Sequence, residues 1–316
     1  MIRFAATRWR LPITMNPINW AYGTSLVPIP DTTSVLMSLP SGGRPRWCVV
    51  DLVTGQMTGG TGMPGHLRAA AFPTPGRGDD RPWVLGTHGL GRLELAPKST
   101  ITEVTRKGIG TYPSTLLPLG DGLLGIGHRH GRSLLLVSTS DGAPVIRLKV
   151  AGPDIAYPLS DQRIRILGPH HAQATDVDVT TVKVVARHQM PYGKHVHHAN
   201  SAVTALLGER AGYENAGGVW HIVPRRVAVL DPQSLTTGRE APAPPDAVEV
   251  LGSDQDDRLV ITNHHGLVLL DPATLAPAAT YQLSRRIRGA ALCPGRNLAA
   301  LLGGDDQDDA LHMVTW

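Results

Sequence analysis

One unit recurs along the chain: a short apolar run, a turn rich in Asp, Pro, Ser, Thr and Gly, and a second apolar run. Runs of this kind between turn residues are typical of β-strands. Helical patterns between the runs are missing, which argues against a fold of alternating strands and helices. The pattern therefore predicts an all-β protein built from repeats.

The clearest copies of the unit are RVAVLDPQSLTTG from Arg226 and GLVLLDPATLAPA from Gly266. The first apolar residues of successive copies are Trp47, Leu93, Leu134, Val177, Val227, Leu267 and Leu311. They are separated by about 46, 41, 43, 50, 40 and 44 residues, near the roughly 40–45 residues of a four-stranded propeller blade. The period predicts seven blades.

The VxVLDPxT cadence of these copies resembles the YVTN and related WD-type propeller repeats, although the Gly-His and Trp-Asp dipeptides of true WD repeats are missing. The resemblance covers nearly the whole chain. It implies a single seven-bladed β-propeller with four-stranded antiparallel blades. It does not imply an activity, because such repeats carry many functions.

The last blade has only three strand runs, IRGAALCP, NLAALLGG and ALHMVTW, before the chain stops at Trp316. The N-terminal run MIRFAATRW has no blade of its own. We expect residues 1–10 to supply the missing strand and to close the ring by pairing with the C-terminal blade, because closure removes open sheet edges. All 316 residues then form one domain.

Composition narrows the possible partners. The net charge is +4, without a run of Lys and Arg or interleaved aromatic residues, so nucleic-acid binding is not expected. Two distant cysteines, Cys48 and Cys293, make neither a disulfide scaffold nor a zinc site. No apolar stretch is long enough for a membrane span, and the first residues lack the apolar core of a signal peptide. We expect a cytoplasmic monomer that binds a protein partner or a small molecule.

Histidines gather in the turns between the second and third strands, which share the top face of a propeller with the starts of the inner strands. Each of these turns reads GTHG, GHRHG, GPHHAQ or NHHG. The histidines are His88, His128, His130, His170, His171, His264 and His265. Such residues can bind metals or transfer protons near neutral pH. A repeated surface turn without a chemical role explains the same pattern.

A second histidine cluster, KHVHHAN, opens the fifth blade and lies on an inner strand. His195, His197 and His198 are the candidate catalytic residues, with His195 and His197 on one face of the strand and His198 on the other. The candidate ligands for a divalent metal are His197, His198, His171 and His265, and Asn200 could join His197. Ordinary packing of polar residues along the channel is the alternative.

The starts of the inner strands supply candidate ligand-binding residues around the top mouth of the channel. Arg and Lys side chains there could hold a carboxylate or phosphate, and Tyr rings could stack on a planar ligand. Solvated charges at a wet channel mouth explain the same residues. The residues are Tyr22, Arg68, Tyr112, Tyr192, Lys194 and Arg288.

Residues 208–225, GERAGYENAGGVWHIVPR, interrupt the fifth blade and lengthen its period. We expect an insertion loop on the top face, either a lid over the channel or a plain surface insertion.

No nucleophile elbow, phosphate-binding loop, dinucleotide fingerprint or HExxH motif is present. Two functions remain open. The first is a binding module that presents a histidine-rich top face to a protein partner or small ligand. The alternative is an enzyme of lyase, cyclase or hydrolase type with a histidine-based site at the top mouth, either with or without a divalent metal.

Overall fold

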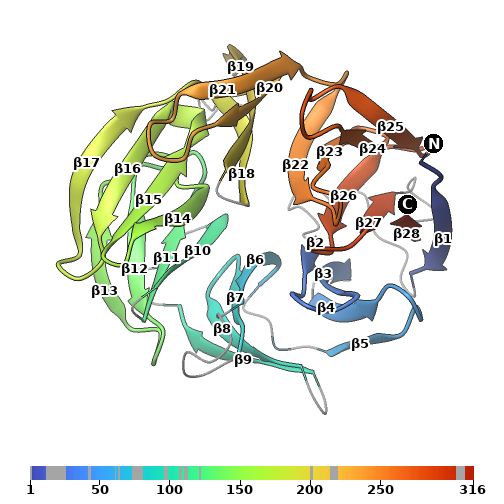
Figure 1. Ribbon diagram of the computed structural model, residues 1–316. Coiled ribbons are helices and arrows are strands. Elements are labelled where there is room, and N and C mark those ends of the chain that lie inside the picture. Colours follow the sequence, from blue (N-terminus) through green and yellow to red (C-terminus); the bar gives the residue numbers. More distant parts are fainter. Residues whose placement is uncertain are drawn as a thin grey trace.

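The computed structural model describes residues 2–11, 26–41, 44–60, 62, 65–72, 81–95, 99–106, 109, 113–120, 122–199, 202–213, 220–303 and 310–316. Seven four-stranded antiparallel sheets stand around a ring (Figure 1). The prediction of a seven-bladed β-propeller is confirmed.

Each of the first six blades uses four consecutive strands, running from the channel outward. Blade 1 contains β2 (Leu26–Pro28), β3 (Ser34–Ser41), β4 (Arg44–Asp51) and β5 (Met57–Gly60). Blade 2 contains β6 (Leu67–Ala71), β7 (Trp83–Gly86), β8 (Leu90–Glu94) and β9 (Thr100–Thr105). Blade 3 contains β10 (Thr115–Gly120), β11 (Leu123–Gly127), β12 (Leu134–Ser138) and β13 (Pro144–Leu148).

The remaining blades repeat this order. Blade 4 contains β14 (Ile155–Ser160), β15 (Arg163–Gly168), β16 (Gln173–Asp178) and β17 (Lys183–Gln189), with a short 3-10 helix η2 (Pro169–His171) after β15. Blade 5 contains β18 (Gly193–Ala199), β19 (Ala202–Tyr213), β20 (Trp220–Leu230) and β21 (Thr237–Pro242). Blade 6 contains β22 (Ala247–Ser253), β23 (Leu259–Asn263), β24 (Gly266–Leu270) and β25 (Pro277–Gln282). Blade 7 contains β26 (Ile287–Leu292), β27 (Leu298–Gly303), β28 (Ala310–Thr315) and β1 (Ala5–Arg10).

The ring closes through its N-terminal strand, as the sequence predicts. β1 pairs antiparallel with β28, from Ala5 opposite Thr315 to Arg10 opposite Ala310. In Figure 1 the blue β1 lies beside the red end of the chain on the outside of blade 7. The two termini therefore complete one sheet, and blade 7 gains the outer strand that its C-terminal part lacks.

The hydrophobic core lies between the blades. Apolar side chains of neighbouring sheets form separate clusters, one at each contact between two blades. Val35 and Met37 of blade 1 pack with Ala300 and Leu302 of blade 7, and all four are fully buried. Each blade is thus stabilised by both of its neighbours, and a missing contact exposes two sheet faces.

The repeated Asp of the LDPxT motif organises the turn between the third and fourth strands. Asp271 Oδ1 accepts hydrogen bonds from the N–H groups of Ala273 (3.0 Å) and Thr274 (2.8 Å) and from the Thr274 hydroxyl (2.9 Å). The same bonds form at Asp231 and at Asp51. The N–H bonds, foremost that of Thr274, lower the pKa of Asp271. The motif therefore marks a turn that caps itself.

The fifth residue of this turn has a left-handed backbone, and its identity sets the contact with the preceding blade. Leu235 and Leu275 adopt φ of 59° and bury their side chains between blades. Blade 1 has Gly55 here, with φ of 72°. A Cβ on Gly55 would lie 2.5 Å from Trp9 Cε3, and Trp9 Nε1 donates to the Leu52 carbonyl at 3.0 Å. The indole of the closing strand thus occupies the space that Leu fills elsewhere.

Residues 208–225, expected as an insertion loop, do lie between the second and third strands of blade 5, but their described parts are strands and not a loop. These parts extend β19 and β20 into a long hairpin, with Glu209 opposite Val223 and Arg210 opposite Ile222. Apolar residues on the return arm explain the extension, since Ile222 is buried. The hairpin tip lies outside the described residues.

We predict that the Trp9 contact with Gly55 is specific to the closing joint. Trp9→Ala should lower the free energy of unfolding by about 2–4 kcal/mol, because it removes a large packed side chain. Gly55→Leu should also destabilise, because its side chain meets the indole. The double variant should recover part of the loss, since Leu at this turn position fits in Leu235 and Leu275. Urea denaturation of the four proteins measures the coupling.

Gly295→Leu is the matched control, because Gly295 has φ of 66° and a Cβ at this position would meet no atom within 4 Å. It carries the same backbone strain without the indole contact, so it should not rescue Trp9→Ala. Strictly additive effects of Trp9→Ala and Gly55→Leu would contradict the proposed exchange of one side chain for another.

Candidate functional site

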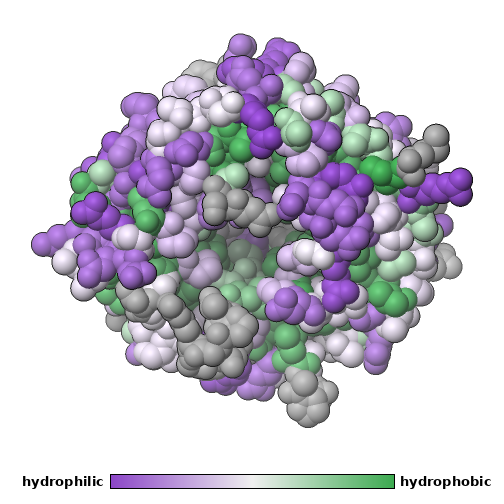
Figure 2. Space-filling view, viewed as in Figure 1, coloured by the Kyte–Doolittle hydropathy of each residue, from purple (hydrophilic) through white to green (hydrophobic). Residues whose placement is uncertain are grey.

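The top face of the ring carries the turns between the second and third strands. Residues 87–89, 128–133, 169–172 and 264–265 form these turns in blades 2, 3, 4 and 6. The centre of the ring is hollowed on the face shown in Figure 2. The inner strands line this channel, so side chains at their ends and in the turns can meet around its mouth.

His195 and Glu249 form a pair across the contact between blades 5 and 6. His195 Nε2 on β18 donates to Glu249 Oε1 on β22 at 3.1 Å, and the two side chains are 14% and 40% exposed. Desolvation opposes ionisation of Glu249, but the charge and hydrogen bond of His195, with Arg129 and His197, lower its pKa overall. Glu249 is therefore ionised at neutral pH and orients the imidazole.

A second pair joins blades 3 and 4. Arg129 Nε, in the turn after β11, donates to Asp154 Oδ1 at 2.7 Å, and the Asp154 side chain is 2% exposed. Asp154 is the main cause of the raised pKa of Arg129, and Glu249 adds to it. Asp154 and Glu249 are thus both engaged by basic side chains, and the two pairs influence each other electrostatically.

Three turn histidines stand in a row beside Arg129. The rings of His128 and His130 are 5.5 Å apart, and those of His130 and His170 are 4.5 Å apart, edge to face. His170 Nε2 donates to the Lys194 carbonyl of blade 5 at 3.1 Å. Desolvation, followed by His130 and Arg129, lowers the pKa of His170 to about 4. The His170 imidazole is therefore neutral at pH 7.

Basic residues from three further strand starts continue around the mouth. Desolvation and the charges of Arg129 and Arg68 lower the pKa of His128, so Arg68 of β6 faces the blade 3 turn. Arg286 Nη2 donates to His264 Nδ1 at 3.4 Å. Desolvation, followed by the charge of Arg286, lowers the pKa of His264, with Asp246 opposing the shift and Lys194 adding to it. The top face therefore presents fixed cations with neutral imidazoles between them.

The three candidate catalytic histidines of β18 do not share one site. Val196 packs in the core toward blade 4, and His198 stacks on Tyr157 of β14 with ring centroids 4.3 Å apart. His195 and His197 face blade 6 instead: the first meets Glu249, and the second lies beside Gly252. The expected alternation along the strand thus sends neighbouring histidines to different blades.

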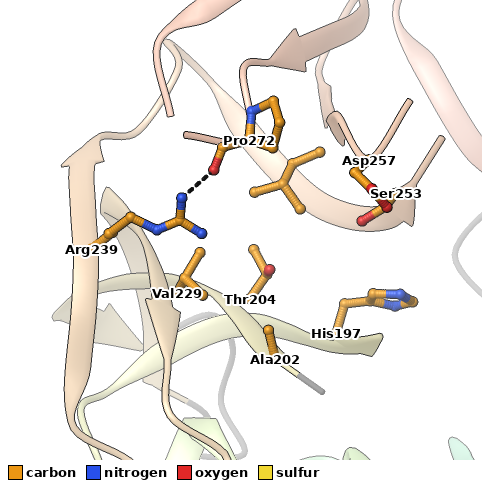
Figure 3. A pocket seen from close by; sticks show the side chains of 9 residues that line it. His197, Ala202, Thr204, Val229, Arg239, Ser253, Asp257 and Pro272 are labelled. Carbon is orange, nitrogen blue, oxygen red and sulfur yellow. Dashed lines mark hydrogen bonds between the residues drawn. The ribbon is translucent and has the colours of Figure 1, made fainter. Parts of the chain in front are cut away.

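His197 lies nearer the opposite face than expected. It lines two cavities of about 450 and 410 Å³, together with Ser253 and Asp257 from the lower end of blade 6. In Figure 3 His197 points from β18 toward the side where these two residues lie, and Arg239 donates to the Pro272 carbonyl across the cavity. Desolvation, then His195 and His198, lowers the pKa of His197 to about 4.

The four residues expected as metal ligands are dispersed. His171 Nε2 donates to the His130 carbonyl at 3.3 Å, and His265 is exposed in the turn before β24. His197 and His198 point to different blades. Across the residues that the structure describes, no group of three or more His, Cys, Asp or Glu side chains is arranged to hold a metal ion. The metal site stays a prediction.

The candidate ligand-binding residues fall into two groups. Arg68, Lys194 and Arg288 lie on β6, β18 and β26 and are half-buried, whereas Tyr192 is 37% exposed just before β18. Tyr22 and Tyr112 lie outside the described residues, as do Asn200 and the acidic run that begins at Asp305.

Sequence reasoning missed Arg129, Asp154 and Glu249. The repeated turns offer a signal for Arg129, which stands between two histidines in GHRHG. Glu249 and Asp154 occupy positions at the start of inner strands, where the sequence prediction names only basic and aromatic residues. An acidic residue at the start of an inner strand was the signal that could have pointed to Glu249 and Asp154 as mouth residues.

The seven four-stranded sheets around a channel define a seven-bladed β-propeller, and solved structures of similar fold support this class. The WD40 domain of Pan2 from Neurospora crassa is similar with a TM-score of 0.71 and 12% identity, over 98% of this chain and 95% of that chain. A catalytically inactive histidine-to-alanine variant of virginiamycin B lyase from Staphylococcus aureus, with quinupristin, is similar with a TM-score of 0.69 and 12% identity, over 99% of this chain and 100% of that chain. A chain of the Mitotic Checkpoint Complex is similar with a TM-score of 0.65 and 10% identity, over 98% of this chain and 90% of that chain.

At these identities the likeness shows the fold alone. No family model and no curated protein matches the sequence. In the described part of the chain, no helix has the length and hydropathy to cross a membrane.

We predict that the fold loses stability at acidic pH and that protonation of His197 accounts for part of this loss. Its folded-state pKa lies below the ordinary value of 6.5, so the unfolded chain binds the proton first as pH falls. The contribution of His197 to the free energy of unfolding is then fully present above pH 6.5 and is lost as the pH falls toward 4. At pH 5 the loss from this residue should be about 1–2 kcal/mol. Urea unfolding of His197→Gln at pH 7 and pH 5 should show a smaller loss than the parent.

His265→Gln serves as the control, because His265 is exposed. It should keep the pH dependence of the parent. An equal loss of stability in the parent and in His197→Gln would show that the imidazole is protonated without cost in the fold.

Proposed function

We propose that this chain is a binding module that receives an acidic segment of a protein partner at the top mouth of its channel. The observation that carries the proposal is the set of basic side chains from several blades beside the turn histidines. Arg129 lies next to His128 and His130, Arg286 donates to His264 at 3.4 Å, and the Lys194 carbonyl accepts from His170 at 3.1 Å. After desolvation, the charges of Arg129 and Arg68 lower the pKa of His128, and Arg286 and Lys194, opposed by Asp246, lower that of His264.

Clustered positive charge of this kind favours an anionic ligand. Such a field attracts acidic groups and accelerates their association. Two described carboxylates at the mouth, Asp154 and Glu249, are already paired with basic side chains, and a third, Asp246, lies near His264. A carboxylate that arrives there meets guanidinium and imidazole donors that it can bridge.

The structural relatives support a binding role. Two of them are a WD40 domain and a chain from a multiprotein assembly, the Mitotic Checkpoint Complex. A rigid ring with loops on one face provides a scaffold on which binding residues keep their positions. The absence of catalytic sequence motifs favours this role over an enzyme.

The proposal predicts that a hexa-aspartate peptide binds and that binding strengthens as pH falls from 7 to 5.5. A bound anion raises the depressed imidazole pKa values, so the complex takes up protons and its dissociation constant falls with pH. Arg68→Gln with Arg288→Gln should weaken binding about tenfold, since two charge-assisted contacts are lost. Fluorescence anisotropy of a labelled peptide at low salt measures both effects.

Arg163→Gln with Arg147→Gln is the control, because both arginines are outside the mouth: Arg163 begins β15 and Arg147 lies on the outer strand β13. The pair removes the same charge and should leave binding nearly unchanged. Equal weakening by both pairs would reduce the effect to net charge, and a hexa-asparagine peptide that binds as well would overturn the proposal.

A second candidate function, lyase-type chemistry, rests on the His195–Glu249 pair. A carboxylate that orients an imidazole is a common acid–base arrangement, and His195 Nδ1 is covered without a hydrogen-bond partner among the described residues. One structural relative is a lyase in a catalytically inactive form in which a histidine is replaced by alanine. Conversion of quinupristin, followed by liquid chromatography, should be absent if the chain only binds. Turnover lost in His195→Ala would favour the enzyme.

A further inference from the structure

A separate basic pocket lies on the top side between blades 3 and 4, outside the channel mouth. It has a volume of about 540 Å³. Its lining residues come from the turn before β12, the segment after β13, η2, β16 and β17. They are Arg132, Lys149, Ala151, His171, Gln173 and Arg187.

The charge of this pocket is not balanced by the protein. Arg132, Lys149 and Arg187 bear positive charges, and no carboxylate is among the described residues that line the cavity. Within the described part of the chain none of the three has a carboxylate oxygen within 4.0 Å. Six other arginines do pair with acidic side chains: Arg81, Arg106, Arg129, Arg165, Arg226 and Arg258. The cavity therefore gathers three positive side chains and offers them to an anionic ligand.

Contacts between the two blades hold the pocket walls in place. Arg187 Nη2 donates to the Lys149 carbonyl at 3.3 Å, and His171 Nε2 donates to the His130 carbonyl at 3.3 Å. Gly152 has φ of 55°, and a Cβ there would lie 2.5 Å from His171 Cδ2. The connection between the blades thus passes close under the imidazole, which only Gly permits.

We propose that this pocket binds the phosphate group of a small phosphomonoester. The charge of three fixed cations suits a dianion better than a single carboxylate. The two guanidinium groups can bind phosphate oxygens in a bidentate way, and the lysine supplies a point charge. Gln173 adds a side-chain amide that can hydrogen-bond to the ligand. The volume lies in the range of small-molecule sites, so it has room for an organic group beyond the phosphate.

Isothermal titration of the full chain with glucose 6-phosphate, inorganic phosphate and malonate tests this proposal in a low-salt, phosphate-free buffer. We expect saturable one-site binding of glucose 6-phosphate and weaker binding of phosphate. Malonate, a dicarboxylate of the same charge, should bind least. Arg187→Gln and Lys149→Gln should each weaken the glucose 6-phosphate affinity by about tenfold.

Arg147→Gln is the matched control, because Arg147 lies on the neighbouring strand β13 and donates to Ser133 rather than lining the pocket. It should bind glucose 6-phosphate as the parent does. No saturable binding of either phosphate, equal binding of malonate, or equal weakening by Arg147→Gln would overturn the proposal.

The same variants separate this pocket from the channel mouth. Arg187→Gln should leave hexa-aspartate binding unchanged, and Arg68→Gln should leave glucose 6-phosphate binding unchanged. A failure of one binding test therefore leaves the other proposal to be judged on its own result. Thermal melting of each variant checks that it is folded, and the exposure of Arg187 makes a folded variant the expectation.

Discussion

The contact between one blade and the turn of the next is the interaction on which the rest of the molecule depends. The turn between the third and fourth strands exposes backbone carbonyls toward its neighbour, and a side chain of the preceding blade donates to them. Trp9 reaches Leu52, Arg165 reaches Pro232, and Arg239 reaches Pro272. The Asp at the start of the turn holds the carbonyls in position, so a local motif produces a long-range contact.

The polar contacts at the channel mouth cross these same joints. His195 meets Glu249 between blades 5 and 6, and Arg129 meets Asp154 between blades 3 and 4. His170 bonds to the Lys194 carbonyl between blades 4 and 5. None of these pairs exists within one sheet. Weakening any one contact between neighbouring blades, including the contact that the N-terminal strand makes with blade 1, would therefore change the distances between the polar side chains that different blades place at the mouth.

This dependence explains which features the sequence could predict. The number of blades, the closing strand and the capped turns follow from a period and from residues close together in sequence, such as Asp271 and Thr274. Pairing between blades follows from the lateral position of one sheet against the next, which no repeat copy records. Glu249 and Asp154 therefore escaped notice. The three histidines of β18 looked like one cluster because alternation gives only the two faces of the strand. It does not show that, on the same face, His195 contacts Glu249 at the mouth whereas His197 lines a cavity nearer the opposite face.

The two basic regions of the top face differ in the origin of their charge, and this difference bears on what each can bind. The channel mouth mixes fixed cations with imidazoles whose pKa values are lowered by desolvation first and by neighbouring charges second, so an acidic ligand there would acquire protonated partners only as it binds. The pocket between blades 3 and 4 relies on the positive side chains of Arg132, Lys149 and Arg187, and only one histidine, His171, lines it. On the two proposals, a ligand at the mouth is coupled to proton uptake, whereas a phosphate in the pocket is held mainly by the charges of arginine and lysine. The two proposed anion sites would therefore respond differently to pH although they lie on one rigid ring.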